Sequence, residues 1–314
     1  MTTQHSSQPA APAGQPQPAT VPADPAASTA PSPSGGGEPA PEVLVLAATG
    51  KTGRRVVPRL RLAGAAVRAA SRSSAVRFDW ADPATWGPAV SGASAVYLVA
   101  PDDPAPVADF VAEAAAAGVE RFVVLSGRGL EHCGPGFGQG MAAAERAARE
   151  SGRQWAIVRA NNFFQNFDED LWREPLRNGR LALPIGEVTE AFVDADDVAD
   201  VAVTLLTTPD ESLLGRVYEV SGPQGITFGE AVATMARAAG RSIAYTELTP
   251  EEYRAELRAA GYPEEAVTAL DTLFALHREG HTAEPTDGVR QVLGREPVPF
   301  ASYVARAAST GVWS

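Results

Sequence analysis

The chain has 314 residues, enough for one large α/β domain or for such a domain with a small additional lobe. Its hydrophobic fraction of 45% supports a substantial core, and its net charge of −12 argues against direct binding of nucleic acid, because phosphate backbones are bound by basic faces. Cys133 is the only cysteine, which excludes a disulfide framework and a cysteine-based metal site. No apolar run of residues approaches the length of a membrane span, so we expect a cytoplasmic protein. We also expect no bound metal.

Residues 1–41 are rich in Pro, Ala, Ser and Gly and contain few large apolar side chains. Such a segment cannot offset the entropy lost on ordering, and it lacks the basic start and apolar centre of a secretory signal. We therefore predict a disordered tail over residues 1–41. A dinucleotide-binding core is expected over 42–160, and residues 161–314 are expected to hold the remainder of the core and a substrate-binding lobe.

From Glu42 onward, short apolar runs alternate with helical stretches. We predict strands over 43–46, 67–70, 96–99, 122–125 and 155–158, and helices over 54–62, 104–117 and 139–151. This alternation is typical of parallel βαβ units, and the runs AVYLVA and RFVVLS are apolar on both faces, as expected where helices cover both sides of a sheet. The predicted fold class is therefore α/β, with a doubly wound, Rossmann-like parallel sheet that binds ligands at the carboxyl ends of its strands.

The rhythm changes after Ala160. We predict helices over 165–177, 194–206 and 228–239, strands over 217–220 and 243–246, and helices that begin near Pro250 and Pro263. These segments are interpreted as a smaller C-terminal lobe over the open end of the sheet.

The stretch VLVLAATGKTGRRV, beginning at Val43, leads from a predicted strand through small residues into a predicted helix. A dinucleotide loop requires this context, because Gly50 and Gly53 let the backbone approach a pyrophosphate and the helix N-terminus supplies amide groups and a positive dipole. Lys51 adds positive charge. An ordinary strand-to-helix turn is the alternative, since Gly-x-x-Gly alone is a weak signal and Ala47 occupies the position of the expected first glycine.

The second predicted strand ends in ASRSS, residues 70–74. An NAD-selective site usually carries Asp or Glu here to bind the ribose hydroxyls, and neither is present. Arg72 can pair with a 2′-phosphate and Ser73 can hydrogen-bond to it, so the sequence favours NADPH over NADH. The alternative is a solvated surface arginine.

Further motifs extend this pattern, namely RFDWADPATW (77–86), AGVERFVVLSG (117–127), QWAIVRANNFFQNF (154–167) and FVDADDVADVAV (192–203). Together with AATGKTG and SRSS, they resemble the NmrA-like branch of the atypical short-chain dehydrogenases/reductases, from Val43 to about Tyr303. RFDWADPATW and GRSIAYTELTPEEY (240–253) are most similar to the ergot-alkaloid-type, festuclavine dehydrogenase-like reductases.

The resemblance implies roles for individual residues. It implies that the pyrophosphate is bound by Thr49, Gly50, Lys51, Thr52 and Gly53, and the 2′-phosphate by Arg72 and Ser73. Asp79 and Trp80 would flank the adenine, and Val99, Ala100 and Pro101 would lie beside the nicotinamide ribose. Asn162, Phe163 and Phe164 would line the site near the nicotinamide.

The acid–base pair of standard short-chain dehydrogenases is missing from the sequence. Those enzymes use a tyrosine with a lysine four residues later. Here Lys51 is the only lysine, and Gln139 and Ala143 stand at the usual distance after Ser126. Alcohol–ketone interconversion therefore loses its usual proton donor. An iminium (C=N) bond is already electrophilic, so hydride delivery to it, or to an activated C=C bond, depends mainly on positioning.

Two roles are open for several other side chains. Ser126 can hydrogen-bond a substrate or satisfy local backbone. Phe163, Phe164 and Phe167 can form an aromatic wall of the site or plain core, and Trp172 is expected in the core.

Three further candidates are assigned structural roles. His277 could donate a proton to the site, but a surface histidine is the preferred interpretation. A nucleophilic His132–Cys133 pair is disfavoured because no carboxylate is placed to orient it. Helix capping, with Asp194 at the N-terminus, is preferred over metal binding for Asp194, Asp196, Asp197 and Asp200.

These observations predict an NADPH-dependent oxidoreductase that acts on a small molecule, as a monomer or homodimer. Ser126, Asn162 and Phe163 are expected to position the substrate, and none of them is assigned as acid or base. Two alternatives remain open. One is a non-catalytic, NmrA-like sensor of NAD(P), which fits the missing Tyr and Lys equally well, and the other is an NAD(P)H:quinone-type reductase.

Overall fold

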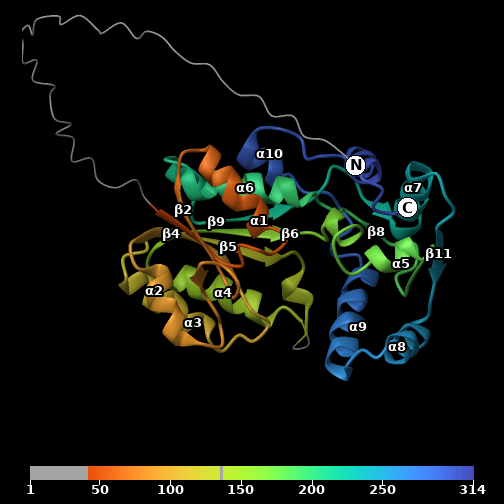
Figure 1. Cartoon of the computed structure of the whole chain (residues 1–314), viewed down its shortest axis with the longest axis horizontal. Coiled ribbons are helices and arrows are strands. Elements are labelled where there is room, and N and C mark those ends of the chain that lie inside the picture. Colours follow the sequence, from red (N-terminus) through yellow and green to blue (C-terminus); the bar gives the residue numbers. More distant parts are fainter. Residues whose placement is uncertain (1–41, 135–136) are drawn as a thin grey trace, which may run out of the picture. The chain divides into compact units, whose positions relative to one another are not determined.

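The computed structural model describes residues 42–134 and 137–314, so the predicted tail over 1–41 lies outside the described residues. The main sheet consists of β1 (Glu42–Val45), β2 (Ala66–Ser71), β3 (Val76–Arg77), β4 (Ala93–Val99), β5 (Arg121–Gly127), β6 (Gln154–Ala160) and β9 (Arg216–Val220). Its strand order is β3-β2-β1-β4-β5-β6-β9, and all neighbouring strands run parallel (Figure 1). The order reverses between β1 and β4, the place where doubly wound sheets bind ligands.

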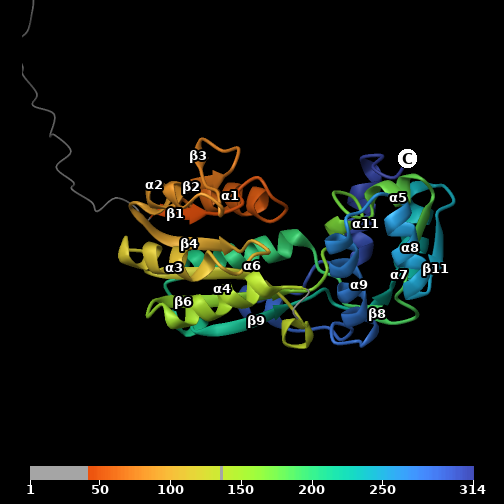
Figure 2. The ribbon, with the colours of Figure 1, turned by 90° about the horizontal axis from the view of Figure 1, so that it is seen from below.

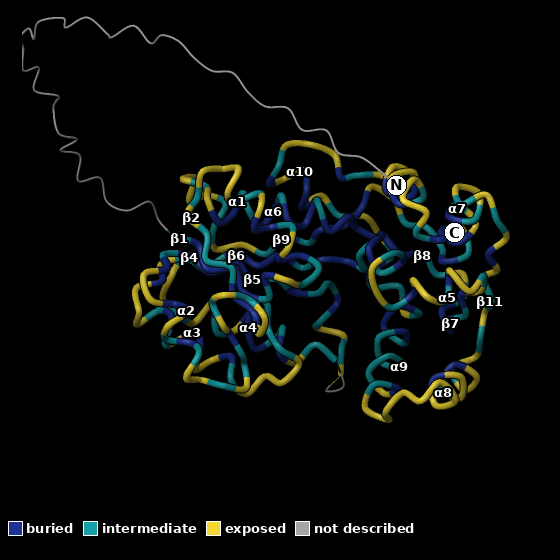
Figure 3. Tube along the Cα trace, in the orientation of Figure 1, coloured by how far each residue is buried: buried dark blue, intermediate teal, exposed yellow. Residues whose placement is uncertain are grey.

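Helices cover both faces of this sheet. One face carries α1 (Gly53–Leu62), α6 (Ala195–Thr207) and α10 (Gly288–Leu293), and the other carries α2 (Trp86–Val90), α3 (Val107–Ala116) and α4 (Gln139–Glu150) (Figure 1). Successive side chains of β1 point to opposite faces of the sheet. Val43 and Val45 pack toward α1 and α6, whereas Leu44 packs toward α3. Figure 3 shows these strands buried between exposed outer helix surfaces. The predicted doubly wound α/β fold is confirmed.

The remaining elements form the C-terminal lobe. It contains α5 (Arg173–Arg177), α7 (Phe228–Ala239), α8 (Pro250–Ala259), α9 (Glu264–Arg278) and α11 (Phe300–Ser309), together with the strand pairs β7 (Arg180–Leu183) with β11 (Ala244–Glu247) and β8 (Thr189–Glu190) with β10 (Ile226–Thr227) (Figure 2). Its core is aromatic and includes Phe167, Phe192 and Phe228. No helix in residues 42–134 and 137–314 is long and apolar enough to cross a membrane.

Local signals fix several helix ends. Thr227 and Glu230 form a reciprocal capping box at the start of α7, and Gly240, with φ of +66°, ends it, so the predicted range of 228–239 is confirmed. Asp194 caps α6 by accepting a hydrogen bond from the Asp196 amide at 3.0 Å, as expected.

One predicted helix, over 165–177, is wrong. The structure has a single 3₁₀ turn at Phe164–Asn166 and the short helix α5. Pro175 has no N–H to donate to the carbonyl group of Leu171, which favours a helix that begins just before it, as α5 does at Arg173, over one that runs through the whole segment. The break leaves an irregular segment with the acidic residues Glu169 and Asp170, which pair with the loop after β1.

Candidate functional site

The loop that connects β1 to α1 has a tight, partly left-handed geometry. Ala47 has φ of +49° and is the only non-glycine residue with positive φ in the described part of the chain. Its carbonyl oxygen accepts a hydrogen bond from the Gly50 amide at 2.8 Å. A Cβ atom added to Gly53 would lie 2.2 Å from that same oxygen, so α1 can approach the loop this closely only with glycine at its first position. Ala47 therefore adopts the conformation that favours glycine at this position.

The N-terminus of α1 is open to an anion. Thr52 makes no side-chain capping bond, and the first turn of α1 contains no acidic residue. The positive end of the helix dipole thus faces the loop without competition from a carboxylate on the helix itself, while the amides of Arg54 and Arg55 donate to the carbonyl oxygens of Gly50 and Thr52. Together with the glycine cradle, this arrangement fits a pyrophosphate group.

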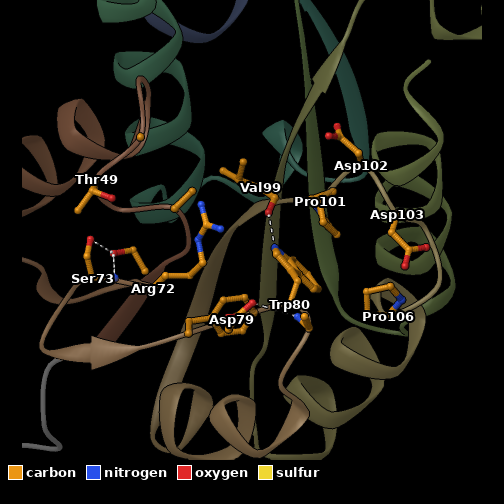
Figure 4. Close-up of a pocket in the computed structure, with 16 residues that line it drawn as sticks. Thr49, Arg72, Ser73, Asp79, Trp80, Val99, Pro101, Asp102, Asp103 and Pro106 are labelled. Carbon is orange, nitrogen blue, oxygen red and sulfur yellow. Dashed lines mark hydrogen bonds between the residues drawn. The ribbon is translucent and has the colours of Figure 1, made fainter. Parts of the chain in front are cut away.

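A cleft of about 590 Å³ opens beside the loop, between the ends of β1, β2 and β4 (Figure 4). It is lined by most of the residues that were predicted to bind a cofactor, namely Thr49, Gly50, Arg72, Ser73, Asp79, Trp80, Val99 and Pro101. Lys51, Thr52 and Gly53 are not among its lining residues. The cleft therefore collects residues from separate segments of the sequence at the strand-order reversal, and their individual contacts with a cofactor stay a prediction.

The end of β2 offers a positive charge to this cleft. Arg72 is exposed, and it forms no ion pair with any described residue; Figure 4 shows its side chain extending between Thr49 and Val99. The serines around it are ordered, since the Ser73 amide donates to Ser71 Oγ at 3.2 Å and the hydroxyls of Ser71 and Ser74 lie 2.7 Å apart. This wall is suited to bind a phosphate group.

An aromatic floor lies opposite Arg72. Trp80 Nε1 donates to the carbonyl oxygen of Val99 at 3.2 Å (Figure 4). Phe78 and Phe110 contact the indole edge-to-face, with ring centroids 5.1 and 5.0 Å away. These contacts fix the indole where it forms an apolar boundary of the cleft, which suits a planar base.

Ser126, at the end of β5, is 3% exposed and donates to Glu145 Oε1 of α4 at 2.7 Å. Arg159 binds the same carboxylate at 2.8 and 2.9 Å. Burial opposes ionisation of Glu145, but the hydrogen bonds from Arg159 and Ser126 outweigh it and hold the pKa of Glu145 below its ordinary value. The hydroxyl proton of Ser126 therefore serves an internal network, and a contact between Ser126 and substrate stays a prediction.

The segment after β6 brings Asn162 and Phe163 next to the β1 loop. The ammonium group of Lys51 lies 5.6 Å from the centroid of the Phe163 ring. Phe163 is half-buried, whereas Phe164 and Phe167 are buried in the aromatic core of the lobe, as is Trp172. Of the three phenylalanines considered for an aromatic wall, only Phe163 remains a candidate.

The expected surface position of His277 is wrong. Its side chain is 4% exposed, and its Nδ1 atom lies 2.9 Å from Oε2 of Glu190, which is also buried. Its Nε2 atom lies 2.7 Å from Asn162 Nδ2. The sequence did contain one signal, since His277 follows the fully buried Phe274 by three residues and shares its face of α9. Glu190 was missed entirely.

Cys133 lies in a partly buried position, and its Sγ atom is 3.6 Å from the carbonyl oxygen of Gly129. Burial, together with the charge of Glu131, raises the pKa of the Cys133 thiol. The neighbouring His132 stacks on His281, with ring centroids 3.6 Å apart. A raised thiol pKa disfavours a nucleophilic role, consistent with the sequence-based expectation.

Known proteins share this architecture over most of the chain. Residues 47–209 match the NAD(P)H-binding family. A (4-alkanoyl-5-oxo-2,5-dihydrofuran-3-yl)methyl phosphate reductase of Streptomyces griseus is 33% identical over 280 residues, which cover 85% of this chain and 98% of the relative. An NAD(P)H azoreductase of Xenophilus azovorans is 31% identical over 287 residues, with coverage of 86% and 99%.

The resemblance to the ergot-alkaloid-type reductases is also confirmed, at lower identity. An agroclavine dehydrogenase of Claviceps fusiformis is 27% identical over 291 residues, covering 84% of this chain and 96% of the relative. Among solved structures, the Citrobacter triphenylmethane reductase complexed with NADP(H) has a TM-score of 0.70 at 19% identity, with coverage of 85% and 99%. The chain thus belongs to the NAD(P)H-binding family and is an oxidoreductase that binds a nicotinamide cofactor.

Proposed function

We propose that this oxidoreductase prefers NADPH to NADH and reduces a polarised C=N or C=C bond of a small molecule in the cytoplasm, without a Tyr–Lys acid–base pair. The observation that carries the proposal is Arg72, which lines the cleft at the end of β2, has no carboxylate partner among the described residues, and has no acidic residue beside it in ASRSS. A guanidinium in this position recognises a phosphate on the adenosine ribose.

Different residues around the cleft would bind different parts of the cofactor. The β1 loop and the N-terminus of α1 would hold the pyrophosphate, Arg72 and Ser73 the 2′-phosphate, and Trp80 the adenine. When bound, a reduced nicotinamide supplies a hydride. The chain itself would orient the acceptor near Asn162 and Phe163, just after β6.

The substrate class is supported by two observations. At the positions of the missing Tyr and Lys, the structure has Gln139, whose side chain donates to the carbonyl oxygen of Gly134 at 3.2 Å, and the buried Ala143, so neither residue supplies a proton. The relative from Streptomyces griseus is named as a reductase of an unsaturated dihydrofuranone, and the relative from Xenophilus azovorans as an azoreductase. The first name describes a carbonyl-conjugated C=C bond and the second an N=N bond, and both kinds of bond can be reduced by hydride. A quinone is a related acceptor and belongs in the same substrate panel.

The test is a calorimetric titration of the wild-type protein and an Arg72→Ala variant with NADPH and NADH. Loss of the charge-assisted contact at this exposed site is expected to cost roughly 2 kcal/mol, or about 30-fold in Kd for NADPH, and to leave Kd for NADH unchanged. Arg77→Ala is the matched control, because Arg77 is an exposed arginine on β3 outside the cleft lining. Equal losses for both cofactors in Arg72→Ala would refute the proposed preference. Absence of NADPH oxidation with every imine, enone and quinone would refute the proposed reaction.

A further inference from the structure

A buried polar cluster in the lobe has no role in the cofactor cleft. Glu190, at the end of β8, and His277, on α9, are 1% and 4% exposed. Thr282 Oγ1 donates to Glu190 Oε2 at 2.6 Å, and the same carboxylate oxygen lies 2.9 Å from His277 Nδ1. Burying a carboxylate and an imidazole is costly unless both are hydrogen-bonded, and here Thr282 contacts both of them.

The cluster continues as a chain of hydrogen bonds to the β1 loop. His277 Nε2 lies 2.7 Å from Asn162 Nδ2, and Asn162 Oδ1 accepts from Asn166 Nδ2 at 3.4 Å. The Oδ1 atom of Asn166 accepts from the ammonium group of Lys51. The chain thus runs from a fully buried carboxylate, Glu190, to the only lysine of the sequence.

The two ends of the chain determine the direction of every bond in it. The Lys51 ammonium can only donate and the Glu190 carboxylate can only accept. Asn166 must therefore turn its oxygen to Lys51 and its amide N–H to Asn162, which in turn directs its own N–H to His277. His277 is left to accept at Nε2 and to donate from Nδ1 to Thr282 Oγ1 at 3.1 Å, whose own proton goes to Glu190, so the network selects a single tautomer.

Lys51 keeps one donor for a ligand. Of its three N–H bonds, the described residues use two, one to Asn166 and one to Asp170 Oδ2 at 3.0 Å. The Lys51 side chain is 17% exposed and lies over the Phe163 ring. In the sequence, Lys51 comes directly after Gly50, which lines the cleft. An ammonium group held in this way is a pre-oriented hydrogen-bond and proton donor beside the expected acceptor site.

Resting on the function proposed above, we infer that Lys51 is the proton donor of the reaction and that the substrate is a neutral, carbonyl-conjugated C=C compound. Glu190 and His277 are positioning residues. They act on Lys51 through Asn162 and Asn166. Hydride adds to the β-carbon of the double bond, the C=C electron pair forms a new double bond between the α-carbon and the carbonyl carbon, and the C=O electron pair moves to the carbonyl oxygen. Lys51 Nζ gives its proton to that oxygen, forming an enol that tautomerises in water. The neutral amine then recovers a proton from solvent. The double bond gains two electrons, which the reduced nicotinamide loses.

A pair of substrates separates this role from simple cofactor binding. An acetyl-substituted butenolide needs a proton as well as a hydride, whereas the N-methyl-dihydroisoquinolinium ion needs only the hydride. We expect Lys51→Met to lower kcat for the butenolide by about 100-fold more than kcat for the iminium ion, which is the size of a general-acid contribution. Equal losses on both substrates, or loss of NADPH binding, would make Lys51 a cofactor ligand and overturn the inference.

The positioning role is tested independently of activity by heteronuclear NMR of the histidine ring nitrogens, which is practical because the chain has four histidines. Wild-type His277 is expected as the Nδ1–H tautomer. Because the Lys51 end still directs the Asn162 N–H to Nε2, Glu190→Gln alone should keep the Nδ1–H tautomer, with a roughly tenfold loss of kcat for the butenolide only. The Nε2–H tautomer should appear when both ends are removed, in Glu190→Gln combined with Lys51→Met. His281→Gln, at a partly exposed histidine that pairs with Glu279, is the control and should leave the His277 signals unchanged.

The outcomes for the inference and for the proposed function are distinguishable. A wild-type protein that reduces neither substrate refutes the proposed reaction, even if the His277 tautomer is as expected. A wild-type protein that reduces the butenolide, with Lys51→Met equally active, refutes the inference alone. Retention of the Nδ1–H tautomer in the double variant Glu190→Gln/Lys51→Met, or an unchanged kcat for the butenolide in Glu190→Gln, refutes the positioning role of Glu190.

Discussion

Replacement of Ala47 by glycine should stabilise the protein. Ala47 holds φ of +49° in the turn after β1, a left-handed conformation that costs an L-residue about 1–2 kcal/mol. Glycine removes this strain, but its greater freedom in the unfolded chain returns about 0.4–1 kcal/mol. The partly buried methyl group contributes little packing to offset the gain. The net expectation is a stabilisation of about 0.5 kcal/mol, or roughly 1 °C in Tm for a chain of this size.

The assay is urea unfolding of Ala47→Gly, compared with wild type and with Ala48→Gly. Ala48 is buried and has no positive φ, so the same substitution there should destabilise by about 1–2 kcal/mol through lost burial and added chain entropy. Kd for NADPH should change by less than about threefold in Ala47→Gly, because the turn is already formed in the free protein. A destabilisation of Ala47→Gly similar to that of Ala48→Gly would refute the strain argument and show that the methyl group packs favourably.

Two further substitutions test the loop and the network beneath β5. Gly53→Ala places a Cβ atom 2.2 Å from the carbonyl oxygen of Ala47, so α1 must move; calorimetry should show NADPH affinity reduced by about 10- to 100-fold, and unchanged affinity would contradict the cradle geometry. Glu145→Gln removes a buried partner of Arg159 and should destabilise by about 2–4 kcal/mol near neutral pH. Because the pKa of Glu145 is lowered in the folded state, this difference is present above its ordinary value of 4.5 and is lost as the pH falls through the folded-state pKa. Urea midpoints of wild type and variant should therefore converge in acid, and a constant difference would contradict the assignment.

Features that depend on neighbouring residues were predictable from the sequence. The apolar runs gave the strands of the sheet, and the capping box at Thr227 and the glycine at position 240 gave both ends of α7. The cleft was predictable for the same reason, since the carboxyl ends of β1, β2 and β4 meet wherever a doubly wound sheet reverses its order. Arg72 could be placed because its position at a strand end determines its surroundings.

Features that depend on distant partners were not predictable. The burial of His277 follows from Glu190, a residue on a two-residue strand that carries no periodic signal of its own. The helix expected over 165–177 follows the apolar pattern but conflicts with Pro175 and with the pairing of Glu169 and Asp170 to the β1 loop. In both cases a tertiary contact decided between local alternatives that the pattern alone leaves equal.

The same contacts change how charge is distributed around the cofactor loop. Sequence reasoning assigned the charge of Lys51 to the pyrophosphate, but in the structure Lys51 pairs with Asp170, and Arg54 and Arg55 pair with Glu169. These carboxylates neutralise the cations of the loop and the first turn of α1, so we expect a pyrophosphate to be bound mainly by backbone amides and the helix dipole. Arg72 is then the cation of the cleft lining without a carboxylate partner in the described residues. A single exposed guanidinium would therefore determine the choice between NADPH and NADH, while Lys51 stays available for the substrate.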